Sequence, residues 1–101
     1  LAWPDSNING GADYSVDFSG LLAPGETVQS FAFDAGGFGA QAWTYLYGTI
    51  CTAWFSWIQA GAASVNVCVL GSSGATYQVA VSVSIDATPA LVADVPPPRP
   101  A

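Results

Sequence analysis

The sequence predicts an all-β fold, a small antiparallel β-sandwich of the immunoglobulin-like type with extended arms at both ends. Three observations lead to this prediction. Apolar and small polar residues alternate along several short segments. Turn-forming sequences rich in Gly separate these segments. No segment combines helical spacing with capping residues. The length of 101 residues suits a single domain with one core.

The clearest predicted element is a hairpin near the end of the domain. Apolar residues alternate in "SVNVCVL", Ser64–Leu70, and "GSSG" at Gly71–Gly74 supplies a turn. A long strand then returns over Ala75–Ile85, with apolar residues at odd positions and small or polar residues at even positions. This pattern is typical of a strand that buries one face.

Earlier segments complete the predicted sandwich. The strands and connections expected there are a strand at Asp13–Ser19, a turn at Pro24-Gly25, a strand at Glu26–Asp34, a strand at Ile50–Ile58 and a small-residue turn at Ala60–Ala63. Ala35–Gly48 is rich in Gly and aromatic residues. We expect a long loop there, with at most one short strand at Trp43–Tyr47.

The two ends differ from the middle in composition. Residues 1–12 form an N-terminal arm, because Trp3-Pro4 excludes a helix at Trp3 and "DSNINGG" is a run of turn formers. Residues 88–101 form a proline-rich C-terminal tail, "TPALVADVPPPRPA", which favours polyproline II and cannot join a sheet interior. The predicted sandwich domain is 13–87.

The charge pattern narrows the class of partner. The chain has seven acidic residues, one Arg and no Lys or His, and its net charge is −6. Phosphate contacts need Lys and Arg, so this balance argues against nucleic acid and against anionic membranes. No Asp, Glu, Lys or Arg occurs from Ala35 to Ile85. So uncharged a surface indicates a subunit that packs against other proteins.

Two further features of this uncharged run have alternative interpretations. Ile50–Leu70 is long enough to span a membrane, but Gln59, Asn66 and the Gly-containing turn divide it into two alternating strands. Cys51 and Cys68 are the only cysteines, and we expect two buried free thiols in a protein assembled in the cytosol. A pair facing each other across neighbouring strands is the alternative.

The sequence carries little catalytic chemistry. Without His or Lys, most general-base and nucleophile arrangements are excluded. Asp13 and Asp17 share a strand face but lie about 13 Å apart by strand rise, too far for a glycosidase pair. "DSNING", Asp5–Gly10, opens like a calcium loop, but Val16 occupies the position of the bidentate Glu. We therefore expect no enzyme, no cofactor and no metal site.

A cluster of aromatic residues is the candidate binding feature. Its members are Trp43, Tyr45, Tyr47, Trp54, Phe55 and Trp57. Three interpretations stay open: Trp54 or Trp57 fills the core, the cluster contacts another protein, or a row of exposed rings stacks on sugar.

The stretch "DYSVDFSGLLAPGETV", Asp13–Val28, preceded by Trp3-Pro4, resembles the first hairpin of the small phage fibre-tail adaptor family. The later pattern of that family, a "TxxWLS" strand, a small-residue turn and a final hairpin, is similar to Thr52–Ser56 and the segments that follow it to Ile85. The resemblance covers roughly residues 1–85. The final hairpin differs from the family in having no charge before Asp86.

This resemblance implies a structural protein of the virion, assembled in the cytoplasm of the host bacterium. It would join tail or neck to tail fibres, in several symmetric copies, through contacts with other virion proteins. A capsid decoration (cement) protein and a carbohydrate-binding module are the alternatives. The expected contact residues are those of the two arms and the aromatic cluster: Trp3, Pro4, Trp43, Tyr45, Tyr47, Trp54, Phe55, Trp57, Pro96, Pro97, Pro98 and Arg99.

Overall fold

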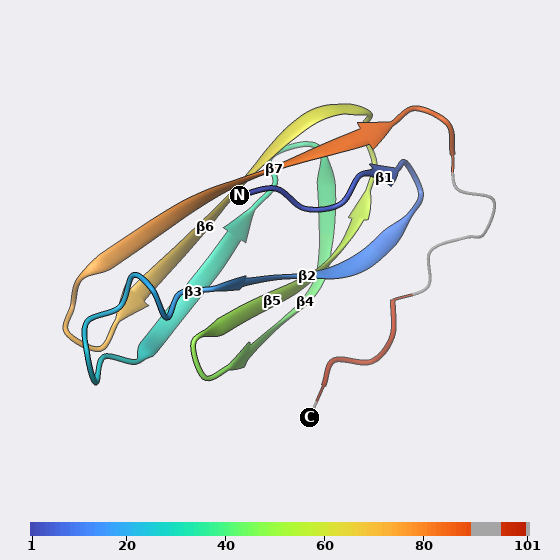
Figure 1. The fold of residues 1–101 in the computed structure, drawn as a ribbon. Helices are drawn as coiled ribbons and strands as arrows, with labels where there is room; N and C mark the ends of the chain where they lie inside the picture. Colours follow the sequence, from blue (N-terminus) through green and yellow to red (C-terminus); the bar gives the residue numbers. More distant parts are fainter. Residues whose placement is uncertain (90–95, 101) are drawn as a thin grey trace.

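The structure, a computed structural model, describes residues 1–89 and 96–100, and this part of the chain contains strands but no helix (Figure 1). There is accordingly no helix in it that could cross a membrane. The strands are β1 (Ser6–Asn7), β2 (Gly11–Asp17), β3 (Val28–Asp34), β4 (Gly39–Tyr47), β5 (Ile50–Trp57), β6 (Gly61–Gly71) and β7 (Thr76–Asp86).

The strands form two sheets that pack face to face. One has the order β1-β7-β6-β3, and the other has the order β2-β5-β4. All neighbours are antiparallel except β1, which runs parallel to β7. Taking β2 to β7 as strands B to G, the sheets are B-E-D and C-F-G, the arrangement of an immunoglobulin-type sandwich. The predicted fold class is confirmed.

The final hairpin also follows the prediction. β6 and β7 pair without interruption from Gly61 with Ile85 to Leu70 with Thr76. Val81, Val83 and Ile85 are buried, whereas the residues between them are exposed. The boundaries differ: β6 begins at Gly61, inside the stretch expected to form a turn, and ends at Gly71, and β7 runs from Thr76 to Asp86.

The prediction for Ala35–Gly48 is wrong, because β4 is a full strand of nine residues paired with β5. A register shift between Gln41 and Trp43 interrupts its alternation, so the period of two is not readable in the sequence. A Cβ at Gly39 would lie 3.0 Å from the ring of Trp57. The glycine that suggested a loop instead lets the strand approach a large core side chain.

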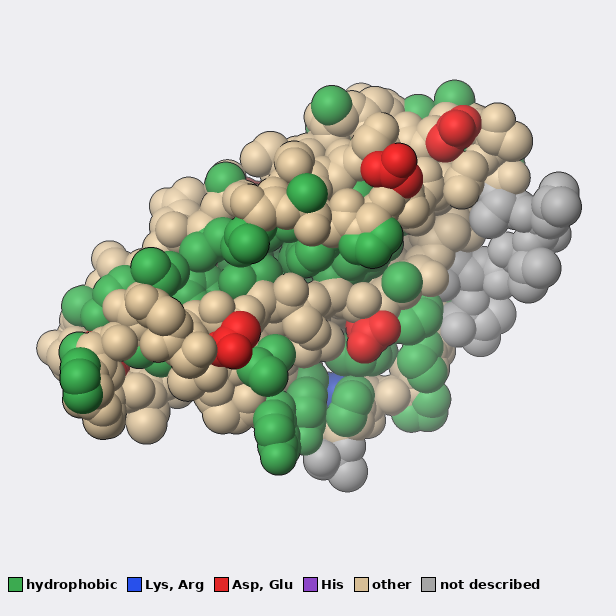
Figure 2. All heavy atoms as spheres, viewed as in Figure 1, with side chains coloured by type: hydrophobic (Ala, Val, Ile, Leu, Met, Phe, Trp, Pro, Cys, Tyr) green, Lys and Arg blue, Asp and Glu red, His purple; other side chains and the backbone are tan. Residues whose placement is uncertain are grey.

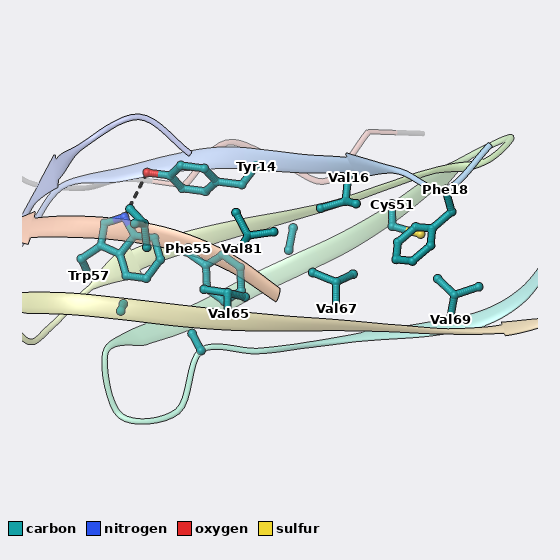
Figure 3. Packing of buried hydrophobic residues seen from close by; sticks show 14 of the residues in the cluster. Tyr14, Val16, Phe18, Cys51, Phe55, Trp57, Val65, Val67, Val69 and Val81 are labelled. Atoms are coloured by element: carbon teal, nitrogen blue, oxygen red, sulfur yellow. Dashed lines mark hydrogen bonds between the residues drawn. The ribbon is translucent and has the colours of Figure 1, made fainter. Parts of the chain in front are cut away.

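The core lies between the sheets and is filled by alternate residues of both (Figure 3). Tyr14, Phe55 and Trp57 from the three-stranded sheet face valines of β6 and β7. The indole N–H of Trp57 donates a hydrogen bond to the Tyr14 hydroxyl at 3.0 Å, so the buried polar atom of Trp57 has a partner. The interpretation that Trp57 fills the core is therefore correct.

The N-terminal arm crosses the seam between the sheets. The backbones of Leu1 and Trp3 both hydrogen-bond to Ser82 of β7. The indole of Trp3 packs on Tyr14, with ring centroids 4.7 Å apart, and its N–H donates to the carbonyl of Ser15 on β2. Figure 2 shows a band of hydrophobic side chains along this seam, between β7 and β2. The arm thus ties the two sheets together.

Candidate interaction surfaces

The outer face of the three-stranded sheet grades from polar to aromatic. Acidic and hydroxyl side chains of β2 lie beside β5, and aromatic side chains of β4 lie on the far side. The strand register places the residues in three rows: Asp13–Trp54–Trp43, Ser15–Thr52–Tyr45 and Asp17–Ile50–Tyr47. Residues directly opposite in a sheet share a face. We call Trp43, Tyr45, Tyr47 and Trp54 the aromatic edge.

The aromatic edge contains four of the six residues of the predicted cluster. Trp43 and Trp54 lie ring against ring, with centroids 6.1 Å apart and planes tilted by 33°. Tyr47 is 71% exposed. The prediction that Phe55 and Trp57 also form a contact surface is wrong, because both side chains point into the core and are at most 1% exposed. The alternation of β5 sends Trp54 outward and its two aromatic neighbours inward.

The proline-rich segment 96–100 lies against β4. The indole N–H of Trp43 donates a hydrogen bond to the carbonyl of Pro97 at 2.9 Å. The Nε–H of Arg99 donates to the carbonyl of Thr44 at 2.6 Å. Because β4 is the last strand of its sheet, this carbonyl has no strand partner beyond it. Two of the predicted contact regions, the aromatic cluster and the tail, therefore meet each other.

The other predicted contact residues lie elsewhere. Trp3 is partly buried at the seam, where it packs on Tyr14, and Pro4 beside it is exposed. Pro96, Pro98 and Arg99 are exposed. The predicted contact residues thus lie in three places. Phe55 and Trp57 are in the core, and Trp3 and Pro4 are at the seam. The others lie on the aromatic edge or in the proline-rich segment beside it.

The outer face of the four-stranded sheet is nearly free of charge. The charged residues on its strands are Asp34 and Asp86, at the ends of β3 and β7, and Asp5, just before β1, lies at its margin near Ala62 and Ser84. Between them lie small, polar or aliphatic side chains: Ser30, Ala32, Ser64, Asn66, Cys68, Leu70, Thr76, Gln78, Ala80, Ser82 and Ser84. We call this surface the uncharged face. The run without charged residues from Ala35 to Ile85 predicted an uncharged surface, but its position on one side of one sheet could not be read from the sequence.

The cysteines lie on different sheets and are both free. Cys51 of β5 is buried in the core, and this burial, with the nearby charge of Asp17, raises the pKa of its thiol to about 11. Cys68 of β6 is exposed on the uncharged face. The prediction of two buried thiols is therefore wrong for Cys68, because Val67 and Val69 take the inward positions on either side.

Glu26 forms a polar clamp that the sequence analysis missed. Its carboxylate accepts hydrogen bonds from the Ser73 hydroxyl, the Tyr77 hydroxyl at 2.6 Å and the Ala23 N–H at 3.0 Å. These bonds lower the pKa of Glu26 to about 2, and the bond from Ser73 has the largest effect. The hydrogen bond to Glu26 raises the pKa of Tyr77. The clamp fixes the loop before β3 to the β6–β7 turn. Two features of the sequence mark Glu26: it is the only Glu, and it lies in the stretch Asp13–Val28 that carries the family resemblance.

Asp17 makes a smaller set of hydrogen bonds that also connects two segments. The backbone N–H of Ser19 and the hydroxyl of Thr49 both donate to Asp17, which lowers its pKa. Within residues 1–89 and 96–100, no three His, Cys, Asp or Glu side chains gather where they could hold a metal ion. The polar groups described here therefore act as connectors between segments.

Comparison with known proteins adds no family to this picture. No protein-family model matches the chain, and no curated protein matches it. The functional argument therefore depends on the surfaces themselves: an uncharged sheet face, an aromatic edge with a bound proline-rich segment, and an arm across the seam.

Proposed function

We propose that this chain is a structural subunit of a bacteriophage particle, an adaptor that joins tail or neck to the tail fibres through protein–protein contacts. The observation that carries the proposal is the uncharged face. A sheet face with charges only around its margin has little to prevent close packing against another subunit. A permanent assembly would cover it.

The motif in Asp13–Val28 is the reason for proposing a tail adaptor in particular. In the structure, the motif residues build the first part of the fold. Tyr14, Val16 and Phe18 enter the core, and Glu26 makes the clamp. The resemblance is thus carried by residues that specify the sandwich and its first loop. The choice of a tail position comes from that resemblance.

The copy number and position of the protein in the particle test this proposal. Particles of the source virus would be separated into heads and tails, and the protein counted by quantitative mass spectrometry. An adaptor at a symmetric tail junction occurs in a small number of copies that remain with the tails. Hundreds of copies that remain with the heads would instead identify a cement protein. Absence from both fractions would refute a virion role.

A pair of charge variants tests the uncharged face directly. Gln78→Lys places a charge in the middle of that face, and Ala87→Lys places one just beyond β7, where the chain is also exposed. Both changes are at exposed positions, so both proteins should fold with similar stability. We expect Gln78→Lys to reduce incorporation into particles and Ala87→Lys to leave it unchanged. Equal incorporation of both variants would show that another surface makes the contact.

A further inference from the structure

The contact between β4 and residues 96–100 has a reciprocal form. Trp43, a residue of the sheet, donates its indole N–H to a carbonyl of the segment. Arg99, a residue of the segment, donates its Nε–H to a carbonyl of the sheet. Each side thus supplies one side-chain donor and one backbone acceptor.

This arrangement suits a proline-rich ligand, which has few backbone N–H donors of its own. Proline has no backbone N–H, so a run such as Pro96-Pro97-Pro98 cannot extend a sheet by ordinary ladder bonds. It offers carbonyl oxygens and an extended polyproline II backbone that is fixed before binding. A surface that recognises it must provide side-chain donors and aromatic rings. Trp43 provides both.

The site is also held in place by the fold. Trp43 packs on Trp54, which stands opposite it on β5. The N–H of Trp54 is shielded from solvent and has no acceptor among the described residues. The free carbonyl of Thr44 completes a site of indole donor, ring surface and edge acceptor.

We propose that Trp43, Trp54 and the carbonyl of Thr44 form a binding site for proline-rich segments that contain an arginine. Its resident ligand is residues 96–100 of the same chain. The proposal goes beyond a role in virions and does not depend on it. Since residues 87–95 tether the ligand, its effective concentration is on the order of millimolar, and a weak site suffices to hold it. The bound segment also covers part of the β4 edge, which limits unwanted strand pairing.

The test uses the full chain with its tail disabled. Four substitutions, Pro96→Ser, Pro97→Gly, Pro98→Ser and Arg99→Gly, remove the ligand and leave the sandwich intact. The probe is a synthetic peptide, VPPPRPA, titrated to millimolar concentration. The readout is the indole region of a ¹H–¹⁵N spectrum, where the four Trp residues give separate signals. Single Trp→Phe variants assign them.

We expect the Trp43 indole signal to move when the tail is disabled and to return toward its original position as peptide is added. The peptide VPPPAPA, which lacks the arginine, should bind about fivefold more weakly, the factor that corresponds to one typical hydrogen bond. Trp43→Phe in the tail-disabled chain should weaken VPPPRPA by a similar factor, followed on the indole signal of the neighbouring Trp54 because this variant has no Trp43 indole. Trp3→Phe is the matched control, because its indole donates to Ser15 and not to the tail.

Three results would overturn the proposal. The first is a Trp43 signal that does not change when the tail is disabled. The second is a signal that does not respond to millimolar peptide, or a Trp43→Phe variant that binds as well as its parent. The third is a wild-type signal that shifts on dilution, which would make the resident ligand the tail of a second copy.

Discussion

Two charged side chains join distant parts of this molecule, and they do so in different ways. Glu26 is the only glutamate, and Arg99 is the only basic side chain. Glu26 accepts hydrogen bonds from three residues and connects the loop before β3 to the β6–β7 hairpin. Within residues 1–89 and 96–100, Arg99 donates one hydrogen bond, to the carbonyl of Thr44 at the edge of β4.

The difference indicates which connection belongs to the fold. Several donors that converge on one carboxylate fix its position, and the loss of that carboxylate leaves all of them without a partner at once. A single bond at an exposed edge can exchange with water at small cost. We therefore infer that Glu26 stabilises the fold and that Arg99 holds the proline-rich segment on β4 reversibly. The predictions below test this assignment, from the largest expected effect to the smallest.

Gly71→Ala should destabilise the fold most. A Cβ at this position would overlap the carboxylate of Glu26, and Gly71 is itself buried. The clamp must open or the strand must shift, and an opened clamp loses all the hydrogen bonds that Glu26 accepts. Urea denaturation measures the change. Gly20→Ala is the control, because nothing lies within 4 Å of its Cβ position. Equal stability of the two variants would show that the clamp adapts freely.

Glu26→Gln should destabilise the fold less than Gly71→Ala, because the amide keeps the shape and one acceptor oxygen. Its NH₂ group would face the donors of Ser73 or Tyr77, which cannot both stay satisfied. The same denaturation experiment measures the effect, with Asp13→Asn on the exposed face of β2 as the charge-matched control. A Glu26→Gln variant as stable as wild type would show that the clamp does not stabilise the fold.

The pH dependence of unfolding should identify the clamp independently. The pKa of Glu26 falls from 4.5 to about 2 on folding, and that of Asp17 is also lowered. A lowered pKa stabilises the folded state above the unfolded pKa, and this contribution is lost as pH falls through the folded pKa. Wild type should therefore lose stability between pH 4.5 and 2, and its advantage over Glu26→Gln should shrink toward zero. An advantage that is constant with pH would contradict the prediction.

The sequence sufficed for elements whose pattern is local. The alternation in Ala75–Ile85 is unbroken, so the strand and its buried face could both be predicted. β4 escaped prediction because its register shift breaks the alternation and its small residues resemble a loop. In β5, aromatic residues occupy both faces, so alternation alone could not decide that Trp54 points outward and Phe55 inward.

The polar contacts could not be predicted for a different reason. The partners of the clamp, Glu26 and Tyr77, are 51 residues apart. Trp43 and Pro97 are 54 residues apart. Such pairs depend on how the two sheets are stacked and on which part of the sheet residues 96–100 lie against, and neither is encoded in any short window of residues. What the sequence did show was that both regions were unusual, a proline-rich end and a cluster of aromatic residues.

The smallest effect on stability is expected for Arg99→Ala. Arg99 is exposed, and substitutions at such positions usually change the free energy of unfolding by less than about 0.5 kcal/mol. The same substitution should nevertheless release the tail, seen as a shifted Trp43 indole signal and as faster proteolysis near the C-terminus. Arg99→Lys keeps the charge but replaces the guanidinium, so it tests whether the geometry of the donor matters. A loss of more than about 1 kcal/mol for Arg99→Ala would place the tail within the cooperative fold, and the contrast with Glu26 would then fail.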